Sequence, residues 1–164
     1  MDQKEVNLHA FLYTLAVSEG TENHPLTKNH GYDVIVYGTD GKPEIFTDFS
    51  THPFADGRPG KIFNSKGERS TASGRYQFLV KYWSHYKAQL NLPDFNPESQ
   101  DKWAIQLIKE CKALEDIYAG RIEEAITKCR SRWASLPGAG YGQHENSMEK
   151  LVTAYKTAGG SVAV

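Results

Sequence analysis

A glutamate at the end of an apolar helix is the strongest candidate for chemistry in this chain. The helix is indicated by one buried stripe with helical spacing, made of Leu8, Phe11, Leu12, Leu15 and Ala16. Gly20 readily ends a helix, so Glu19 falls in its last turn, where the helix dipole opposes a carboxylate. This position, with burial, would raise the pKa of Glu19. Glu19 is therefore a candidate general acid, although such a glutamate is more often a solvated surface residue.

Two further segments carry side chains suited to holding a sugar. Ser73–Gln77 places the phenol of Tyr76 and the amide of Gln77 beside a glycine, at the predicted start of a helix. Trp133–Gly142 holds Tyr141 among three glycines, which would present its ring on a loop wall. A plain helix start and a plain interhelical loop are the structural alternatives.

Other kinds of chemistry find no support in the sequence. It contains no His-Glu-x-x-His, Cys-x-x-Cys, phosphate-binding glycine loop or Gly-x-Ser-x-Gly motif, and its six histidines lack ligand spacing. We therefore expect no metal and no cofactor. The net charge of −1 argues against nucleic acid as a partner. Cys111 and Cys129 fall on apolar helix faces and are expected to be reduced, buried thiols. Sugar cleavage by carboxylate chemistry is the remaining enzymatic interpretation.

The elements that must position these residues follow from local patterns. Residues 33–37 and 44–49 are rich in β-branched and aromatic side chains and predict a hairpin, joined through residues 39–43. Residues 50–73 show no sustained period, so this segment is either a functional loop or hides irregular strands.

Helices are predicted for the remainder of the chain. One runs from Tyr76 to about Leu90, and the next begins at Pro97 behind an Asn96 cap. Shorter helices are expected over residues 113–120 and 122–133, and a last one from Asn146, with Glu149 placed as in a capping box. We expect residues 1–164 to form a single domain with neither a signal peptide nor a membrane span.

These segments also resemble a known family, the lambda-type phage endolysins, which are lytic transglycosylases of bacterial peptidoglycan. The resemblance runs over most of the chain and is carried by Ser18–Thr21, Asn29–Val36, Phe46–Asp48, Gly74–Gln77, Ser99–Asp101 and Trp133–Gln143. It implies an α+β, lysozyme-like domain: a mostly helical lobe and a small antiparallel β lobe with a cleft between them. The chain departs from the family pattern around Thr39–Pro43 and over Phe54–Thr71.

The resemblance also assigns roles to individual residues. Glu19 matches the family's single catalytic acid, Gln77 and Tyr141 match positions lining the sugar-binding cleft, and Asp33 matches a cleft-side acid. Tyr76 is expected beside Gln77 among the substrate-binding residues.

The implied reaction cleaves the β-1,4 bond between N-acetylmuramic acid and N-acetylglucosamine and forms 1,6-anhydromuramic acid ends, which causes host cell lysis. Two alternatives remain open. One is a hydrolytic muramidase with a second carboxylate, whose candidates are Asp33 first, then Glu44, Asp48, Asp56 and Glu68. The other is a non-catalytic peptidoglycan-binding module.

The resemblance further implies partners and a location. The enzyme is expected to be a monomer that acts on peptidoglycan glycan strands. It would accumulate in the host cytoplasm and reach the periplasm and cell wall through membrane lesions made by a holin.

Overall fold

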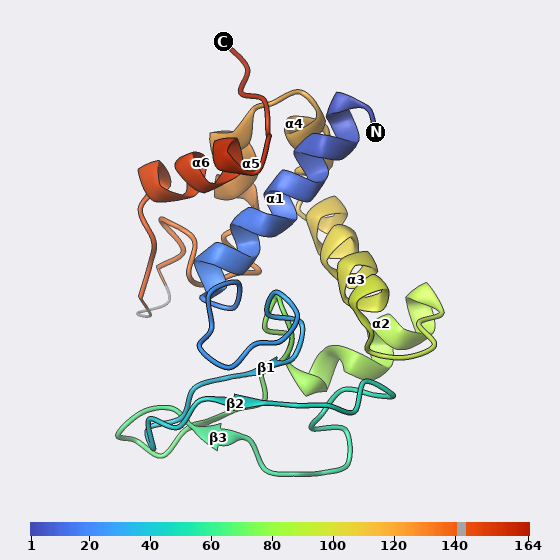
Figure 1. The fold of residues 1–164 in the computed structure, drawn as a ribbon, viewed down its shortest axis with the longest axis vertical. Helices are drawn as coiled ribbons and strands as arrows, with labels where there is room; N and C mark the ends of the chain where they lie inside the picture. Colours follow the sequence, from blue (N-terminus) through green and yellow to red (C-terminus); the bar gives the residue numbers. More distant parts are fainter. Residues whose placement is uncertain (141–143) are drawn as a thin grey trace. The chain divides into compact units, whose positions relative to one another are not determined.

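The computed structural model describes residues 1–140 and 144–164, and the chain divides into two units (Figure 1). The helical unit consists of Met1–Glu19 and Ala104–Val164, and the β unit consists of Gly20–Trp103. The prediction that the whole chain acts as one domain stays a prediction.

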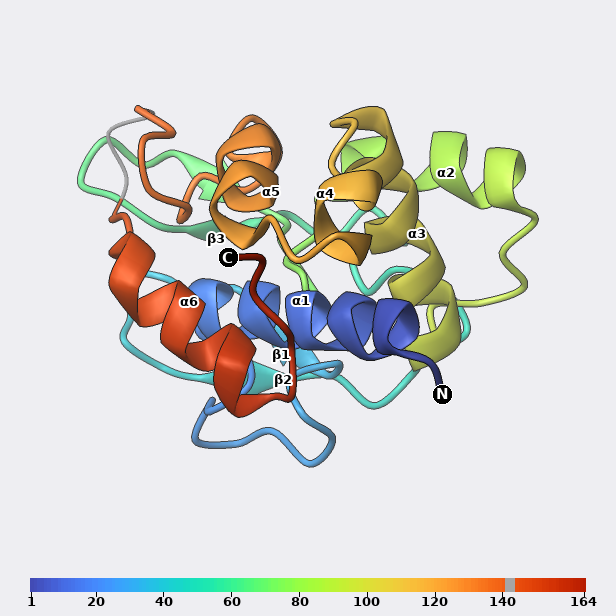
Figure 2. The ribbon, with the colours of Figure 1, turned by 90° about the horizontal axis from the view of Figure 1, so that it is seen from above.

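Helix α1 (Gln3–Glu19) is the central element of the helical unit. It packs against α4 (Leu114–Tyr118) and α6 (Met148–Thr157), and α4 and α6 also contact α5 (Ile122–Cys129) (Figure 2). The predicted stripe is confirmed because Phe11, Leu12, Leu15 and Ala16 are buried. Gly20 has φ +76°, so the backbone turns out of the helix directly after Glu19, as predicted.

The start of α6 differs from the prediction by one residue. Ser147 caps the helix, and its hydroxyl accepts a hydrogen bond from the Lys150 N–H. Asn146 is instead buried, and its amide donates to the carbonyl oxygen of Ser18 at 2.8 Å. The capping-box prediction for Asn146 and Glu149 was therefore wrong, since a long-range contact engages the asparagine side chain.

Helix α5 also differs from the prediction, because it ends at Cys129 rather than at Trp133. Turns follow it, with the Arg132 N–H donating to the Cys129 carbonyl. Both cysteines are free thiols, as predicted, but only Cys129 is buried, whereas Cys111 is half-buried. No helix within residues 1–140 and 144–164 combines the length and the apolar character that a membrane crossing requires.

Two short antiparallel sheets form in the β unit. Strands β1 (Val34–Ile35) and β2 (Glu44–Ile45) pair with Val34 opposite Ile45, which confirms the predicted hairpin with shorter strands. Strands β3 (Lys61–Ile62) and β4 (Arg69–Ser70) pair with Lys61 opposite Ser70. The aperiodic segment 50–73 therefore does contain irregular strands, one of the two interpretations open from the sequence.

The segment predicted as a helix from Tyr76 begins instead as a tight turn. Ser73 and Phe78 exchange both backbone hydrogen bonds, at 3.0 and 2.9 Å, and Gln77 takes a left-handed backbone with φ +56°. Helical structure begins only with a 3₁₀ turn, η1 (Val80–Tyr82), which leads into α2 (Trp83–Leu90). The prediction of a helix start at residues 73–77 was wrong because pairing within the turn replaces helical hydrogen bonds.

Aromatic side chains fill the interior of the β unit. Phe78 stacks on Trp103 with ring centroids 4.0 Å apart, and Phe95 lies edge-on to Trp83 at 5.4 Å. Trp103 belongs to α3 (Pro97–Glu110), which begins at the proline predicted from the sequence. A mostly helical chain with small antiparallel sheets confirms the predicted α+β class.

Candidate active site

Glu19 is the last residue of α1 and is half-buried. Burial raises the pKa of its carboxyl group to about 7, and a hydrogen bond from the Ser135 side chain lowers it in part. Burial disfavours the charged carboxylate, whereas the serine hydroxyl favours it. At neutral pH Glu19 therefore exists in both protonation states, as an acid that gives up a proton and later regains it requires.

Ser135 approaches Glu19 from the segment after α5. Its hydroxyl oxygen lies 2.7 Å from that of Ser18, and its carbonyl accepts from the Asn146 N–H at 2.8 Å. Ser135 lies within the segment Trp133–Gly142 that the sequence singled out, but the predicted role there was given to Tyr141. Tyr141 lies outside the described residues, so its role in sugar binding stays a prediction.

Gln77 lies in the β unit, at the left-handed position of the turn described above. Its side-chain amide donates to the Gly74 carbonyl at 2.9 Å, and the residue is half-buried. This bond holds the amide group close to its own turn. The role of Gln77 as a sugar contact stays a prediction.

Tyr76 is placed in the interior, with 1% of its surface exposed. Its hydroxyl donates to Asp101 at 2.6 Å, and burial, together with the negative charge of Asp101, holds its pKa well above the usual range. A side chain this deeply buried packs the β unit. Its placement does not support the prediction of Tyr76 as a substrate-binding residue.

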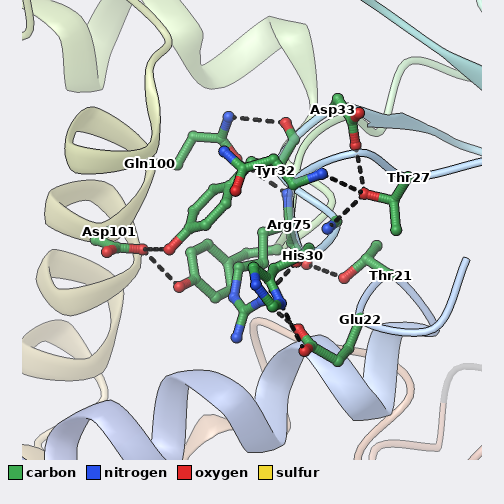
Figure 3. Close-up of polar contacts among 12 residues, drawn as sticks. Thr21, Glu22, Thr27, His30, Tyr32, Asp33, Arg75, Gln100 and Asp101 are labelled. Carbon is green, nitrogen blue, oxygen red and sulfur yellow. Dashed lines mark hydrogen bonds and ion pairs between the residues drawn. The ribbon is translucent and has the colours of Figure 1, made fainter.

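Asp33 is likewise a buried structural residue, 4% exposed. One carboxylate oxygen accepts from the Thr27 hydroxyl at 2.5 Å (Figure 3), and the other accepts from the Lys28 N–H at 2.9 Å. Both oxygens thus hold the loop that precedes β1. This placement does not support the prediction of Asp33 as a residue that faces the substrate.

A polar network in the same unit joins this loop to the Gly74–Gln77 turn (Figure 3). The Arg75 guanidinium binds Glu22 and the His30 carbonyl oxygen, and it lies over the Tyr32 ring, 5.2 Å from its centroid. Tyr32 and Tyr76 both donate to one oxygen of Asp101. The network was not predicted, since Asp101 entered the sequence analysis only as part of the resemblance.

Gln100 completes this network at the start of α3. Its side-chain oxygen accepts from the Arg75 N–H at 2.9 Å, and its nitrogen donates to the carbonyls of Tyr32 and Phe95 at 3.1 and 2.9 Å. One buried amide therefore fixes three segments, which explains why the turn that carries Gln77 holds a defined shape.

Three of the remaining candidate carboxylates line one hollow of about 360 Å³ in the β unit: Glu44, Asp48 and Asp56. Glu44 is paired with Arg58 at 2.6 Å and Lys61 at 3.2 Å. Asp48 and Asp56 accept hydrogen bonds from the N–H groups of Ser50 and Arg58 and remain exposed. Glu68, also exposed, is not among the lining residues.

The chain is similar to known proteins over nearly its full length. The family model described as Endolysin matches residues 9–162. The endolysin of Escherichia phage P2 is 71% identical over 154 residues, which are 94% of this chain and 93% of that protein. The endolysin of Escherichia phage lambda is 51% identical over 154 residues, or 93% of this chain and 91% of that protein.

A solved structure gives the same result at the level of the fold. The lysozyme of bacteriophage lambda complexed with a chitohexasaccharide matches with a TM-score of 0.86 and 48% sequence identity, covering 96% of this chain and 97% of that one. This match confirms the lysozyme-like class that the resemblance implied. Because the family model and both relatives cover nearly the full length, the chain belongs to the endolysin family.

Proposed function

We propose that this endolysin cleaves the β-1,4 bond between N-acetylmuramic acid and N-acetylglucosamine as a lytic transglycosylase. Membership of the endolysin family supports the coarser assignment, a glycosidase that cleaves peptidoglycan. The observation that supports the transglycosylase assignment is the half-buried Glu19 carboxyl group. Its pKa of about 7 suits both donating and accepting a proton.

In the proposed reaction Glu19 acts twice. Its protonated form gives a proton to the glycosidic oxygen as the bond from that oxygen to C1 of N-acetylmuramic acid breaks. The resulting carboxylate then takes the proton of the C6 hydroxyl of the same sugar, and the C6 oxygen forms a bond to C1. An intramolecular hydroxyl has a high effective concentration and so outcompetes water. Glu19 ends protonated, no water is consumed, and the product carries a 1,6-anhydro ring.

The hydrogen bonds of Asp33 support a mechanism in which Glu19 is the single catalytic acid. A hydrolytic glycosidase normally needs a second carboxylate as nucleophile or as base for water. Asp33, the first candidate, uses both oxygens to hold the loop before β1, and Glu44 is neutralised by two cations. Asp48 and Asp56 line an open hollow and keep the hydrolytic muramidase as the second candidate function.

Mass spectrometry of the soluble products separates the two reactions. Digestion of purified peptidoglycan in ¹⁸O-labelled water should yield anhydro-muropeptides without the label, because no water enters, whereas hydrolytic products would be heavier by one labelled water, about 20 Da. A hydrolytic muramidase run in parallel serves as the positive control for incorporation. Products that mainly carry the label at a reducing end would refute the transglycosylase and promote Asp48 or Asp56 to catalyst.

The variant Glu19→Gln tests whether the family's chemistry is retained in this chain. Removing the acid should lower the rate of wall lysis by about 10²- to 10⁴-fold or more while the fold is kept. Turbidity of bacteria stripped of their outer membrane measures lysis, and circular dichroism checks the fold. Wild-type protein that binds walls without lowering turbidity would instead indicate the non-catalytic binding module.

We further propose that the protein acts on glycan strands, by analogy with the lambda lysozyme bound to a chitohexasaccharide, and that it does so as a monomer. The family resemblance supports accumulation in the host cytoplasm and release through holin lesions. Cell fractionation with and without a co-expressed holin tests this route. Appearance of the enzyme in the periplasm while the inner membrane is intact and no holin is present would contradict it.

A further inference from the structure

A chain of hydrogen bonds within the helical unit leads from a surface lysine to Glu19. Lys150 of α6 donates to the Asn146 side-chain oxygen at 2.9 Å, and the Asn146 side-chain nitrogen lies 3.2 Å from the Ser18 hydroxyl. The Ser18 and Ser135 hydroxyl oxygens are 2.7 Å apart, and a hydrogen bond from the Ser135 side chain lowers the pKa of Glu19. The four links come from α1, α6 and the segment after α5, so only the folded unit assembles them.

When Glu19 is ionised, the two ends of this chain set the direction of every bond in it. The Lys150 ammonium can only donate, so it must face the oxygen of the Asn146 amide, and the amide nitrogen then points at Ser18. At the other end an ionised carboxylate can only accept, so Ser135 must donate its single proton to Glu19. The Ser135 oxygen is then left to accept from Ser18. Each group donates toward the glutamate.

This polarity matches one of the two forms of Glu19. Hydrogen bonds that point toward an acceptor polarise one another and are stronger when the final acceptor is charged. The chain therefore favours the carboxylate, the form that exists after the proton has left and before it is regained. Burial acts in the opposite sense, because it disfavours the charge.

We propose that Ser135 is a positioning residue for Glu19, and that Ser18 and Asn146 orient its hydroxyl so that the carboxylate is held and stabilised between the two proton transfers. This inference rests on the proposed function, since it names the group that supports the same acid. None of the three residues is required to touch the substrate.

Several charged side chains close in sequence to Ser135 and Asn146 make contacts of their own. Glu145 accepts hydrogen bonds from the N–H groups of Gly138 and Gly140, at 2.9 and 3.0 Å. Arg132, which follows α5, pairs with Glu110 at 2.8 Å, and Lys150 is bound to Asn146. Among the described residues, burial and Ser135 are the causes of the shifted Glu19 pKa. Removing the serine hydroxyl should therefore act on Glu19 directly.

Carbon-13 NMR titration of the full-length protein labelled at glutamate side-chain carboxyl groups tests the proposal. The Glu19 signal is the one that disappears in Glu19→Gln. Ser135→Ala should raise its titration midpoint by about one pH unit, since a hydrogen bond to a charged group is lost. Ser135→Thr, which keeps the hydroxyl, should restore the wild-type midpoint. Ser84→Ala, at an exposed serine of α2, is the matched control and should leave it unchanged.

A double-mutant cycle separates an ordered chain from mere packing. Ser18→Ala should raise the midpoint by less than Ser135→Ala does, because Ser135 keeps its bond to Glu19. In the Ser135→Ala background, Ser18→Ala should have no further effect, since its only route to the carboxylate is gone. Additive effects of the two substitutions, or an unchanged midpoint in Ser135→Ala, would overturn the proposal.

Other outcomes of these experiments also test the proposal. If Ser135→Ala does not fold, Ser135→Thr and Ser18→Ala still test the chain by the same titration. The alkaline limb of the activity profile should move upward in Ser135→Ala, because protonated Glu19 persists to higher pH. Hydrolytic products from the wild-type enzyme would refute the transglycosylase while leaving the titration result intact, so the two proposals fail separately.

Discussion

Replacing Glu19 with glutamine should change how the stability of the protein depends on pH. The Glu19 pKa is about 7 in the folded protein, against an ordinary value of 4.5. Glutamine has nearly the same shape but cannot ionise. The comparison of the two proteins therefore isolates the cost of burying this one charge.

The sign and size of the effect follow from the shift in pKa. A carboxyl group whose pKa is raised by folding stabilises the native state fully below pH 4.5, and this contribution is lost as the pH rises to about 7. Each pH unit between the two values is worth about 1.4 kcal/mol, so the loss is on the order of 3 kcal/mol. Relative to Glu19→Gln, the wild-type protein should thus lose stability between pH 4.5 and 7 and stay constant above.

Two buried histidines act in the opposite sense over part of this range. Burial lowers the pKa of His52 to about 4 and also lowers that of His24, so their contribution to stability grows as the pH rises toward 6.5. The absolute stability of the wild-type protein therefore mixes these effects. Both histidines are present in the variant as well, so they cancel in the difference between the two proteins.

Urea unfolding of both proteins, followed by circular dichroism at intervals from pH 4.5 to 8.5, measures this difference. The free energy of unfolding of Glu19→Gln, relative to that of the wild type, should rise by about 3 kcal/mol across this pH range. The midpoint of this rise should lie between the two pKa values. Equal slopes at all pH values would show that the folded-state pKa of Glu19 is ordinary. That result would refute the reasoning that makes it the acid.

Three further predictions concern other parts of the molecule. Gln77→Ala should weaken binding of chitin-type oligosaccharides in calorimetric titrations without loss of stability; unchanged affinity would make Gln77 purely structural. Gly74→Ala should destabilise the protein by more than about 2 kcal/mol in urea unfolding, because the residue has φ +84° and an added Cβ would overlap the Gln100 side chain; near-wild-type stability would contradict the described turn. Cys111 should be alkylated at a lower pH than an ordinary thiol, since a hydrogen bond from the Cys129 side chain lowers its pKa, whereas peptide mapping should find Cys129 protected by burial.

Local patterns in the sequence were sufficient for much of the fold. The apolar stripe and Gly20 predicted α1 and placed Glu19 in its last turn, because helical periodicity and glycine's left-handed backbone act over a few residues. The β1–β2 hairpin and the start of α3 at Pro97 were found for the same reason. The candidate acid could thus be named from its neighbours along the chain, without knowledge of what packs against it.

The tertiary structure determined which residues surround Glu19 and which of the predicted substrate-binding residues are buried. Tyr76 is buried and bonded to Asp101, which lies 25 positions away in the sequence. Contacts over shorter distances in the sequence hold Asp33, through Thr27 and Lys28, and pairing of Ser73 with Phe78 replaced the predicted helix start. Ser135 contacts Ser18 across 117 positions of sequence, and Asn146 reaches the same serine across 128. No periodicity encodes such contacts, since burial and hydrogen bonds between distant segments form only when the helices pack and exclude water. The raised pKa of Glu19 depends on that same burial. The local sequence therefore locates the acid, whereas the tertiary structure sets its pKa.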